Sequence, residues 1–331
     1  MTAYVLAGDI GGTKTDLAIY SVIPQGKLSL VREASFPSQH YPGLEAVLRE
    51  FLSSGQEQVA AGAFGIAGPV IDGEVLATNL PWRVTAAGVV GVMGCERVRL
   101  MNDLETTAYG TLFLAPDELQ TLNAGTPRRG NRAVIAAGTG LGQAFLFWDG
   151  QRYRAVATEG GHADFAPRDE LEVELLHFLR KRYSRVSYER LLSGPGLFSL
   201  FSFLDQELHR PVAPSVRERL DKEDPAAVVG QAGVTGLCAA CTEAVDLFLS
   251  LYGAQAGNLA LTVMGTGGVY IGGGIITKLL SRVPTSAFMR SFLAKGRYAQ
   301  FMAGISVHII LNPKASQLGA AQAACELLDQ E

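Results

Sequence analysis

The stretch AYVLAGDIGGTKTDLAIYSV, residues 3–22, decides which fold the chain is expected to adopt. Its apolar residues 3–9 predict a strand, Gly11-Gly12 predicts a turn, and residues 15–22 predict a second strand. Glycines let backbone N–H groups come close to phosphate oxygens, and Thr13 adds a hydroxyl donor. The turn is therefore a candidate phosphate loop, and an ordinary hairpin turn is the alternative.

The rest of the chain continues with helices and strands in an order that recurs in its second half. In the first half we expect strands at 27–36, 59–68 and 97–101, and helices at 44–52 and 104–111. In the second half we expect strands at 133–138, 143–148, 153–157, 269–271 and 306–311, a helical region at 169–261, a helix at 275–280 and a closing amphipathic helix at 317–328.

The two halves share one local pattern, a strand followed by a glycine-threonine turn and another strand. Ala137-Gly138-Thr139-Gly140 stands in the second half where Asp9-Ile10-Gly11-Gly12-Thr13 stands in the first. Such duplication predicts an α/β protein with two similar lobes facing each other across a central cleft. We expect a small lobe of residues 1–112 completed by 303–331, and a large lobe of residues 113–302 with a helical insertion. Pro127-Arg128-Arg129-Gly130 is the candidate surface linker between the lobes.

The glycine motifs differ from the two commonest nucleotide-binding motifs. A Walker A loop needs Gly before Lys-Ser/Thr, but Thr13 holds that place, and the loop leads into a strand where a P-loop would open a helix. The segment 138–142 lacks the Gly-x-Gly-x-x-Gly spacing of a dinucleotide site. It remains a second candidate phosphate loop. Gly272-Gly273-Gly274, between a strand and a helix, is a candidate surface for adenine or ribose, with close helix–strand packing as the alternative.

Composition excludes several functional classes. The 331 residues are 48% hydrophobic and 18% charged, which predicts a sizeable core, and the net charge of −4 without a basic block disfavours nucleic-acid binding. We expect a cytoplasmic protein, because the sequence opens directly into a strand. Interrupting polar residues make 244–277 a buried helix and strand rather than a membrane span. The pair Cys238 and Cys241 predicts reduced thiols in helical packing, with redox chemistry or metal binding as alternatives.

Five motifs carry a resemblance over nearly the whole chain, from Asp9 to about Gly319. In chain order they are Asp9-Ile10-Gly11-Gly12-Thr13, Leu100-Met101-Asn102-Asp103, Gly138-Thr139-Gly140-Leu141-Gly142, Glu159-Gly160-Gly161-His162-Ala163-Asp164-Phe165 and Leu192-Ser193-Gly194-Pro195-Gly196-Leu197. Together they resemble the bacterial glucokinase family. The resemblance implies two ribonuclease-H-like lobes of the actin-like ATPase superfamily, with ATP, Mg²⁺ and sugar in the cleft, and a homodimer. It also implies phosphorylation of the 6-hydroxyl of D-glucose, which feeds glycolysis.

The resemblance also implies a role for individual residues. Asp103 would be the catalytic base, because phosphoryl transfer needs a carboxylate that orients the acceptor hydroxyl and takes its proton. The implied glucose ligands are Asn79, Asn102, Asp103, Glu159, His162 and Glu189. The implied nucleotide-binding residues are Asp9, Gly11, Gly12, Thr13, Gly138, Thr139, Gly140, Gly273 and Gly274. Asp9 would hold Mg²⁺ through water.

Plainer interpretations exist for each of these residues. Asp103 could cap the helix expected from Leu104, Asn79 could cap a turn, and Glu189 could be a solvated helix residue. The segment Glu159-x-x-His162-x-Asp164 could be a polar loop or hold a metal, although a loop offers no fixed helical face for metal ligands.

Three other functions compete with glucose phosphorylation. The first is a kinase for another hexose, such as N-acetylglucosamine or mannose, of the related ROK type. Lys14 is ROK-like, whereas the zinc cluster of many ROK kinases is absent because no cysteine lies between Cys95 and Cys238. Gly68 also departs from the glucokinase pattern, in which Cys is expected. The second is a non-catalytic sugar sensor, and the third is a glycosidase that pairs Asp103 with Glu159.

Overall fold

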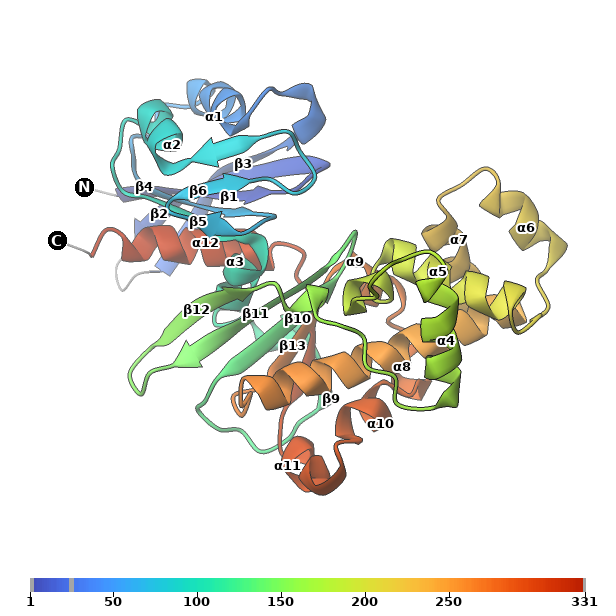
Figure 1. Cartoon of the computed structure of the whole chain (residues 1–331). Coiled ribbons are helices and arrows are strands. Elements are labelled where there is room, and N and C mark those ends of the chain that lie inside the picture. Colours follow the sequence, from blue (N-terminus) through green and yellow to red (C-terminus); the bar gives the residue numbers. More distant parts are fainter. Residues whose placement is uncertain (1–2, 24–26, 330–331) are drawn as a thin grey trace. The chain divides into compact units, whose positions relative to one another are not determined.

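The computed structural model describes residues 3–23 and 27–329, and the chain forms two compact units. The first unit comprises Met1–Glu118, Ala144–Ala157 and Asn312–Glu331, and the second comprises Leu119–Gln143 and Thr158–Leu311. Each unit is built on an α/β core of its own (Figure 1). The predicted α/β class and the predicted duplication are therefore confirmed.

The first unit consists of β1 (Ala3–Ile10), β2 (Lys14–Ile23), β3 (Lys27–Pro37), α1 (Leu44–Ser53), β4 (Val59–Ile66), β5 (Val70–Ile71), β6 (Glu74–Leu76), β7 (Arg83–Thr85), α2 (Ala86–Met93), β8 (Val98–Asn102), α3 (Asp103–Gly110) and α12 (Ala315–Glu326). Its main sheet has the order β3-β2-β1-β4-β8, and β5, β6 and β7 form a small separate sheet. The predicted strands and helices of this half are confirmed within a few residues. The small sheet was not predicted, because its strands are too short to show a period. Helix α2 was not predicted either.

The second sheet has the order β12-β11-β10-β13-β14-β9. Its strands are β9 (Leu119–Asn123), β10 (Arg132–Ala137), β11 (Leu141–Trp148), β12 (Tyr153–Thr158), β13 (Val269–Gly272) and β14 (Val307–Ile310). Its first five positions repeat the order of the first sheet, with β10 in the place of β1 and β13 in the place of β4. The shared glycine-threonine turns therefore follow equivalent strands, as the sequence predicted.

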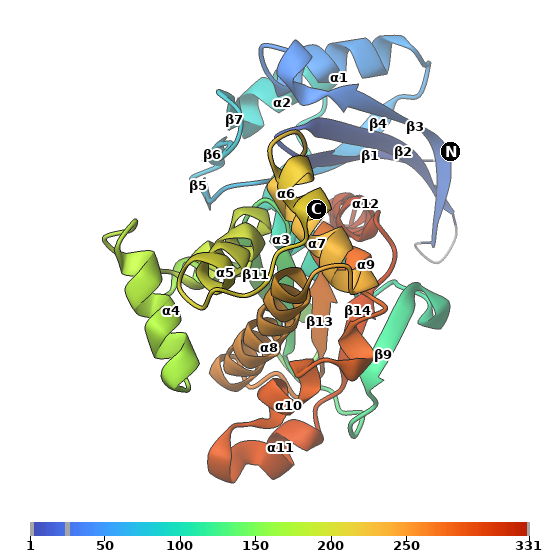
Figure 2. The same cartoon turned by 90° about the vertical axis from the view of Figure 1, so that its right-hand side faces the viewer.

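Helices cover each sheet by burying apolar faces. In the first unit α1 presents Leu44, Val47, Leu48 and Phe51 to the core. The helices of the second unit are α4 (Glu170–Arg180), α5 (Gly194–Gln206), α6 (Pro214–Leu220), α7 (Pro225–Thr235), α8 (Ala239–Thr262), α9 (Gly274–Lys278), α10 (Phe288–Leu293) and α11 (Ala299–Ala303). The long helix α8 runs beside β13 (Figure 2), and its Tyr252 hydroxyl lies 3.1 Å from the backbone carbonyls of both Ile135 and Gly272, which share its one hydrogen. The Tyr252 side chain thus connects α8 with β10 and β13 through hydrogen bonding.

The closing helix differs from its prediction. It was expected to be amphipathic, but α12 is buried around most of its surface, including Ala315, Gly319 and Ala323. It packs against α3, β1 and β4 within the first unit. Small residues at these positions let the backbones of α12 and α3 approach closely, and a narrow side of the helix with Gln322 and Glu326 is left towards solvent.

The unit boundaries also differ from those expected. The chain enters the second unit at Leu119, because β9 pairs antiparallel with β14. The expected linker at 127–130 therefore lies inside the second unit, between β9 and β10. Residues 303–311, expected in the small lobe, also belong to the second unit, because β14 pairs in parallel with β13. The hairpin segment Ala144–Ala157, expected in the large lobe, groups with the first unit.

The cysteines and the apolar stretch agree with their predictions. Cys238 and Cys241 are buried free thiols at the start of α8, and burial raises the pKa of the Cys241 thiol. The stretch 244–277 forms most of α8 and then β13. No single helix among the described residues is long and apolar enough to cross a membrane; α7 and α8 reach that length together only with a bend of 97°.

Candidate active site

Three strands of the first sheet bring their carboxyl ends to one edge. Ile10 of β1 is paired with Ile66 of β4, and Ile66 is paired with Asn102 of β8, all in parallel. Because the ends of parallel strands meet at the same edge of a sheet, the segments that follow them are neighbours. The turn after Ile10, the turn after Ile66 and Asp103 are thereby brought together, as the Asn102 side-chain amide shows by donating to the Gly68 carbonyl at 3.0 Å.

A buried serine holds the first glycine turn. The Ser38 hydroxyl donates to the carbonyl of Gly11 at 2.8 Å, and the Ser38 backbone N–H donates to the carbonyl of Thr13 at 3.0 Å. The N–H of Gly11 closes the turn onto the Lys14 carbonyl at 2.9 Å. That N–H is therefore used inside the turn, so the phosphate-binding prediction for this loop rests on Gly12 and Thr13.

Asn102, and not Asp103, caps helix α3. The Asn102 side-chain oxygen accepts from the N–H of Leu104 at 2.9 Å, and the Glu105 carboxylate accepts from the N–H of Asn102, which completes a capping box. Asp103 is the first helical residue and is half-buried. The alternative in which Asp103 is the helix cap is therefore wrong, because its neighbour holds that position.

The carboxylate of Asp9 lies at the end of β1, close to Asp103. The hydroxyl of Ser316 on α12 donates to Asp9 Oδ1 at 3.0 Å and lies 2.9 Å from the hydroxyl of Thr106 on α3. The pKa of Asp9 is raised to about 6, chiefly by burial and also by the charges of Asp103 and Asp16, whereas the Ser316 hydrogen bond acts in the opposite direction. The ionised carboxylate is therefore held at an energetic cost, which is typical of a functional group.

We expect Asp9→Asn to stabilise the free protein above pH 6. The pKa of Asp9 is raised from 3.8 in the unfolded chain to about 6, so ionisation destabilises the native state increasingly between these values and fully above pH 6. The substitution removes this penalty at pH 8 and has a much smaller effect near pH 4, where Asp9 is still protonated in the native state and only partly ionised in the unfolded chain. Denaturant unfolding at the two pH values measures the difference. A variant that is less stable than wild type at pH 8 would contradict the expectation.

Asn79 lies directly against the first glycine turn. A Cβ atom added at Gly12 would collide with the Asn79 side chain, so the two residues are in van der Waals contact. Asn79 is exposed in the turn before the buried Leu80 and Trp82, and the Trp82 indole N–H donates to the Tyr41 carbonyl. The buried Trp82 side chain holds this turn in place by packing in the core, whereas Asn79 stays at the surface.

Three further predicted residues, Glu159, His162 and Glu189, lie close together in the second unit. Nε2 of His162 is 3.9 Å from a carboxylate oxygen of Glu159, and Nδ1 of His162 is 3.8 Å from one of Glu189. The side chains of Glu159 and His162 are more than half exposed, whereas Glu189 is 29% exposed. The structure therefore brings the carboxylate of Glu189 to a carboxylate and an imidazole of the segment 159–162, about thirty residues earlier in the chain.

The motif Ser193-Gly194-Pro195-Gly196 positions Glu189. The Ser193 hydroxyl donates to the Glu189 carbonyl at 2.8 Å and accepts from the N–H of Gly196 at 3.1 Å, so it caps α5 and holds the preceding turn. The carboxylate of Glu189 accepts from the N–H of Leu141 at 3.0 Å. Glu189 thus connects the glycine loop 138–142 to the cluster around His162, and the solvated-helix alternative for it is wrong.

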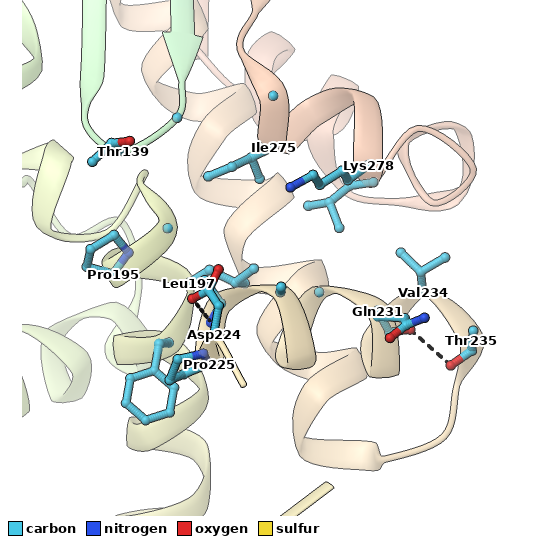
Figure 3. A pocket seen from close by; sticks show the side chains of 18 residues that line it. Thr139, Pro195, Leu197, Asp224, Pro225, Gln231, Val234, Thr235, Ile275 and Lys278 are labelled. Atoms are coloured by element: carbon cyan, nitrogen blue, oxygen red, sulfur yellow. Dashed lines mark hydrogen bonds between the residues drawn. The ribbon is translucent and has the colours of Figure 1, made fainter. Parts of the chain in front are cut away.

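A pocket of about 910 Å³ opens in the second unit beside the glycine segments. Figure 3 shows Thr139 at one end of it and Lys278 on α9 at its upper edge, opposite Asp224 and Pro225 at the start of α7. Pro195, Leu197 and Ile275 supply apolar walls. Its volume and largely apolar lining fit a flat aromatic ligand of nucleoside size. Sequence reasoning missed Asp224, Gln231, Ile275 and Lys278, because no motif marks them.

The glycines predicted at this pocket have different roles. Gly138, Thr139 and Gly274 line it, and added Cβ atoms at Gly138 and Gly274 would meet nothing within 4 Å. Gly273 has a φ of 90°, and a Cβ there would collide with the Ala137 backbone. For Gly273 the close-packing alternative therefore holds. A Cβ at Gly140 would collide with the Glu189 carboxylate, so this glycine lets Glu189 approach the loop.

The family model for glucokinase matches residues 6–327 of the chain. The chain belongs to the glucokinase family. It is similar to the glucokinase of Nostoc sp. strain PCC 7120, with 38% identity over 98% of this chain and 99% of the relative. Its fold is similar to that of a glucokinase from an Antarctic psychrotroph, with a TM-score of 0.83, 28% identity and coverage of 98% and 99% of the two chains.

The fold is also shared with a ROK-family glucokinase from Streptomyces griseus, solved in complex with glucose and AMPPNP. The TM-score is 0.65 and the identity is 20%, over 98% of this chain and all of the other. This likeness shows the common fold alone. The predicted resemblance to the bacterial glucokinases is thus confirmed. The predicted fold, which is the ATPase-like fold of sugar kinases, is confirmed as well.

Proposed function

We propose that this member of the glucokinase family transfers the γ-phosphoryl group of ATP to the 6-hydroxyl of D-glucose. The observation that carries the proposal is the position of Asp103, which follows a strand end in the first turn of α3 while Asn102 provides the cap. Asp103 Oδ1 accepts from the N–H of Leu104 at 2.9 Å, and a carboxylate has further lone pairs that can accept from an acceptor hydroxyl. Family membership over nearly the whole chain supports glucose and ATP as the substrates.

Asp103 acts as the base in the proposed reaction. Its carboxylate accepts the proton of the glucose 6-hydroxyl as the O6–Pγ bond forms and the bond from Pγ to the β,γ-bridging oxygen breaks. The proton resides on Asp103, ADP leaves with the bridging oxygen, and glucose 6-phosphate is the other product. A positioned base of this kind accelerates proton transfer by about 10²–10⁴-fold.

Glu159, His162 and Glu189 bind the glucose hydroxyls in this proposal. A carboxylate accepts two hydrogen bonds from neighbouring hydroxyls, and an imidazole donates through one nitrogen and accepts through the other. Asn79 and Asn102 contribute amide contacts from the first unit. Both polar atoms of Asn102 already have one partner each, and each retains a further lone pair or hydrogen for a ligand.

The nucleotide is bound by the glycine loops and the pocket of the second unit. Adenosine occupies the pocket shown in Figure 3, against Ile275 and Pro195. Thr13, Thr139, Gly12, Gly138 and Gly140 face the phosphate chain. Lys278 adds a cation at the pocket edge, where it can approach an anionic ligand.

Asp9 is the residue that would hold Mg²⁺, through water. The fit is chemical, because a hard divalent cation prefers carboxylate oxygens and would stabilise the ionised form of a carboxylate whose pKa is raised mainly by burial. When bound, the ion neutralises charge on the β- and γ-phosphates. Among residues 3–23 and 27–329 no group of three His, Cys, Asp or Glu side chains is arranged to hold a metal.

The enzyme is further proposed to work in the cytoplasm as a homodimer and to feed glycolysis. These statements rest on the family resemblance. Sedimentation of the purified protein tests the dimer.

An ADP-release assay with a panel of sugars tests the proposed function. With MgATP we expect turnover on D-glucose and a much lower kcat/KM on mannose and N-acetylglucosamine, which differ at one position. Loss of a single buried polar contact discriminates strongly between such substrates. Equal rates on several hexoses would replace the glucose assignment with a general hexose kinase. Sugar hydrolysis without ATP would instead support a glycosidase.

A further inference from the structure

A second cavity lies in the first unit, outside the residues assigned to glucose or ATP. Its volume is about 430 Å³, within the range of about 300–1,000 Å³ typical of small-molecule sites. Its lining comes from β8, α3, α12 and the β11–β12 hairpin. The polar residues that line it are Arg99, Tyr109, Arg152, Tyr153, Arg154 and Glu326.

Arginines outnumber carboxylates among the residues that line this cavity. Three arginines line it against one glutamate, and the Glu326 carboxylate accepts a hydrogen bond from the Tyr109 hydroxyl. Arg152 and Arg154 share the single carboxylate of Asp149, at 4.0 and 2.9 Å. Each guanidinium carries five N–H donors, so one shared carboxylate satisfies only a small part of their capacity.

Arg99 adds a third guanidinium from a different element. Its distance to the Glu105 carboxylate is 3.8 Å, which is longer than a hydrogen bond, and 41% of its side chain is exposed. Three arginines, from β8 and the β11–β12 hairpin, thus line one cavity. Planar, multidentate donors of this kind recognise phosphate groups in particular.

We propose that this cavity is an effector site for a phosphate dianion, either free or carried by a small polar metabolite. Arg152 lines the cavity, its side chain is 70% exposed, and among the described residues its one ion pair is the 4.0 Å contact to Asp149, so we take it as the principal ligand. A phosphate bound there accepts hydrogen bonds from Arg152 and Arg154 of the hairpin and from Arg99 of β8.

The lining elements connect the cavity with the proposed active site. β8 continues from Arg99 to Asn102, over about 10 Å at the rise of a strand, and α3 begins at Asp103 and reaches Tyr109. Helix α12 spans about 15 Å from Ser316, which binds Asp9, to Glu326. A ligand that draws these ends together therefore acts on elements that hold Asp9 and Asp103.

Calorimetric titration of the active-site-saturated enzyme tests the binding step. The protein is first loaded with glucose and a non-hydrolysable ATP analogue, so that neither product nor phosphate enters the active site. Inorganic phosphate and glucose 6-phosphate are then titrated separately, and the tighter of the two identifies whether the ligand is free or carried. We expect binding to one site per chain, weakened about tenfold in Arg152→Ala because one charge-assisted contact is lost.

Two further variants make the binding test specific. Arg152→Lys preserves the charge and should recover part of the affinity. Arg83→Ala removes an arginine of the same unit with similar exposure, 67%, that is paired with Glu74, and should bind as wild type does. Absence of binding by both probes, or equal affinity in wild type and Arg152→Ala, would overturn the proposal.

The effector role is tested by kinetics and rests on the proposed function, whereas the binding test does not. Binding of the ligand should change the KM for glucose by about fivefold, the lower range of typical coupling, in wild type and Arg83→Ala but not in Arg152→Ala. Arg152→Ala should keep the basal turnover, because it lies outside the proposed catalytic residues. A glucose KM that does not respond while the phosphate binds would overturn the effector role.

Discussion

Replacing Asp103 with Asn should lower kcat by about 10²–10⁴-fold while glucose and ATP still bind. The amide keeps the shape of the carboxylate and can still accept from the N–H of Leu104, as Asp103 Oδ1 does at 2.9 Å. It accepts no proton from the glucose hydroxyl at neutral pH. The loss therefore falls on the chemical step, because Asn102 and Glu105 continue to cap α3.

Steady-state kinetics combined with calorimetry separate the chemical step from binding. The same Asp-to-Asn change at the exposed Asp117, in the turn Pro116–Glu118, is the matched control and should leave kcat unchanged. If the Asp103→Asn variant turned over at nearly the wild-type rate, another group would be the base. A variant that lost glucose binding as well would point to a role for Asp103 in holding the sugar.

Replacing Gly319 with Ala should destabilise the first unit by about 1–3 kcal/mol, the cost of overpacking a filled core. A Cβ at this position would collide with the backbone of Thr106 and Gly110 on α3. The helices would have to separate, and Ser316, which joins α12 to Thr106 and to Asp9, would move with them. We therefore expect a lower denaturation midpoint and a reduced kcat.

Gly91 provides a control in which the same substitution should have the opposite effect. It is an exposed residue within α2, and an added Cβ would meet nothing within 4 Å. Alanine has the higher helix propensity, so Gly91→Ala should stabilise the protein by about 0.4–1 kcal/mol. Urea unfolding of both variants measures the two effects. Equal changes in the two variants would mean that the contact between α12 and α3 is not tight.

Much of the fold was predicted from the sequence, since it depends on local patterns. The strands around Asp9 and Gly138, the α1 face and the helical region before β13 follow from apolar periodicity and from glycine turns. The position of helix α12 was predicted correctly, but the predicted amphipathic pattern of its residues was wrong. Its small residues show no amphipathic period, and only the packing against α3 reveals that nearly all of its faces are buried.

The candidate site divides in the same way. The sequence alone determined which residue types carry the chemistry, because strand-end acids and glycine turns are local features. Tertiary structure decided which of them come together: it placed Glu189 beside His162 and Ser316 of α12 beside Asp9. It also formed the pocket lined by Lys278 and the arginine cavity. These contacts join residues that are distant in the chain, and strand pairing and helix packing fix them without a local sequence pattern.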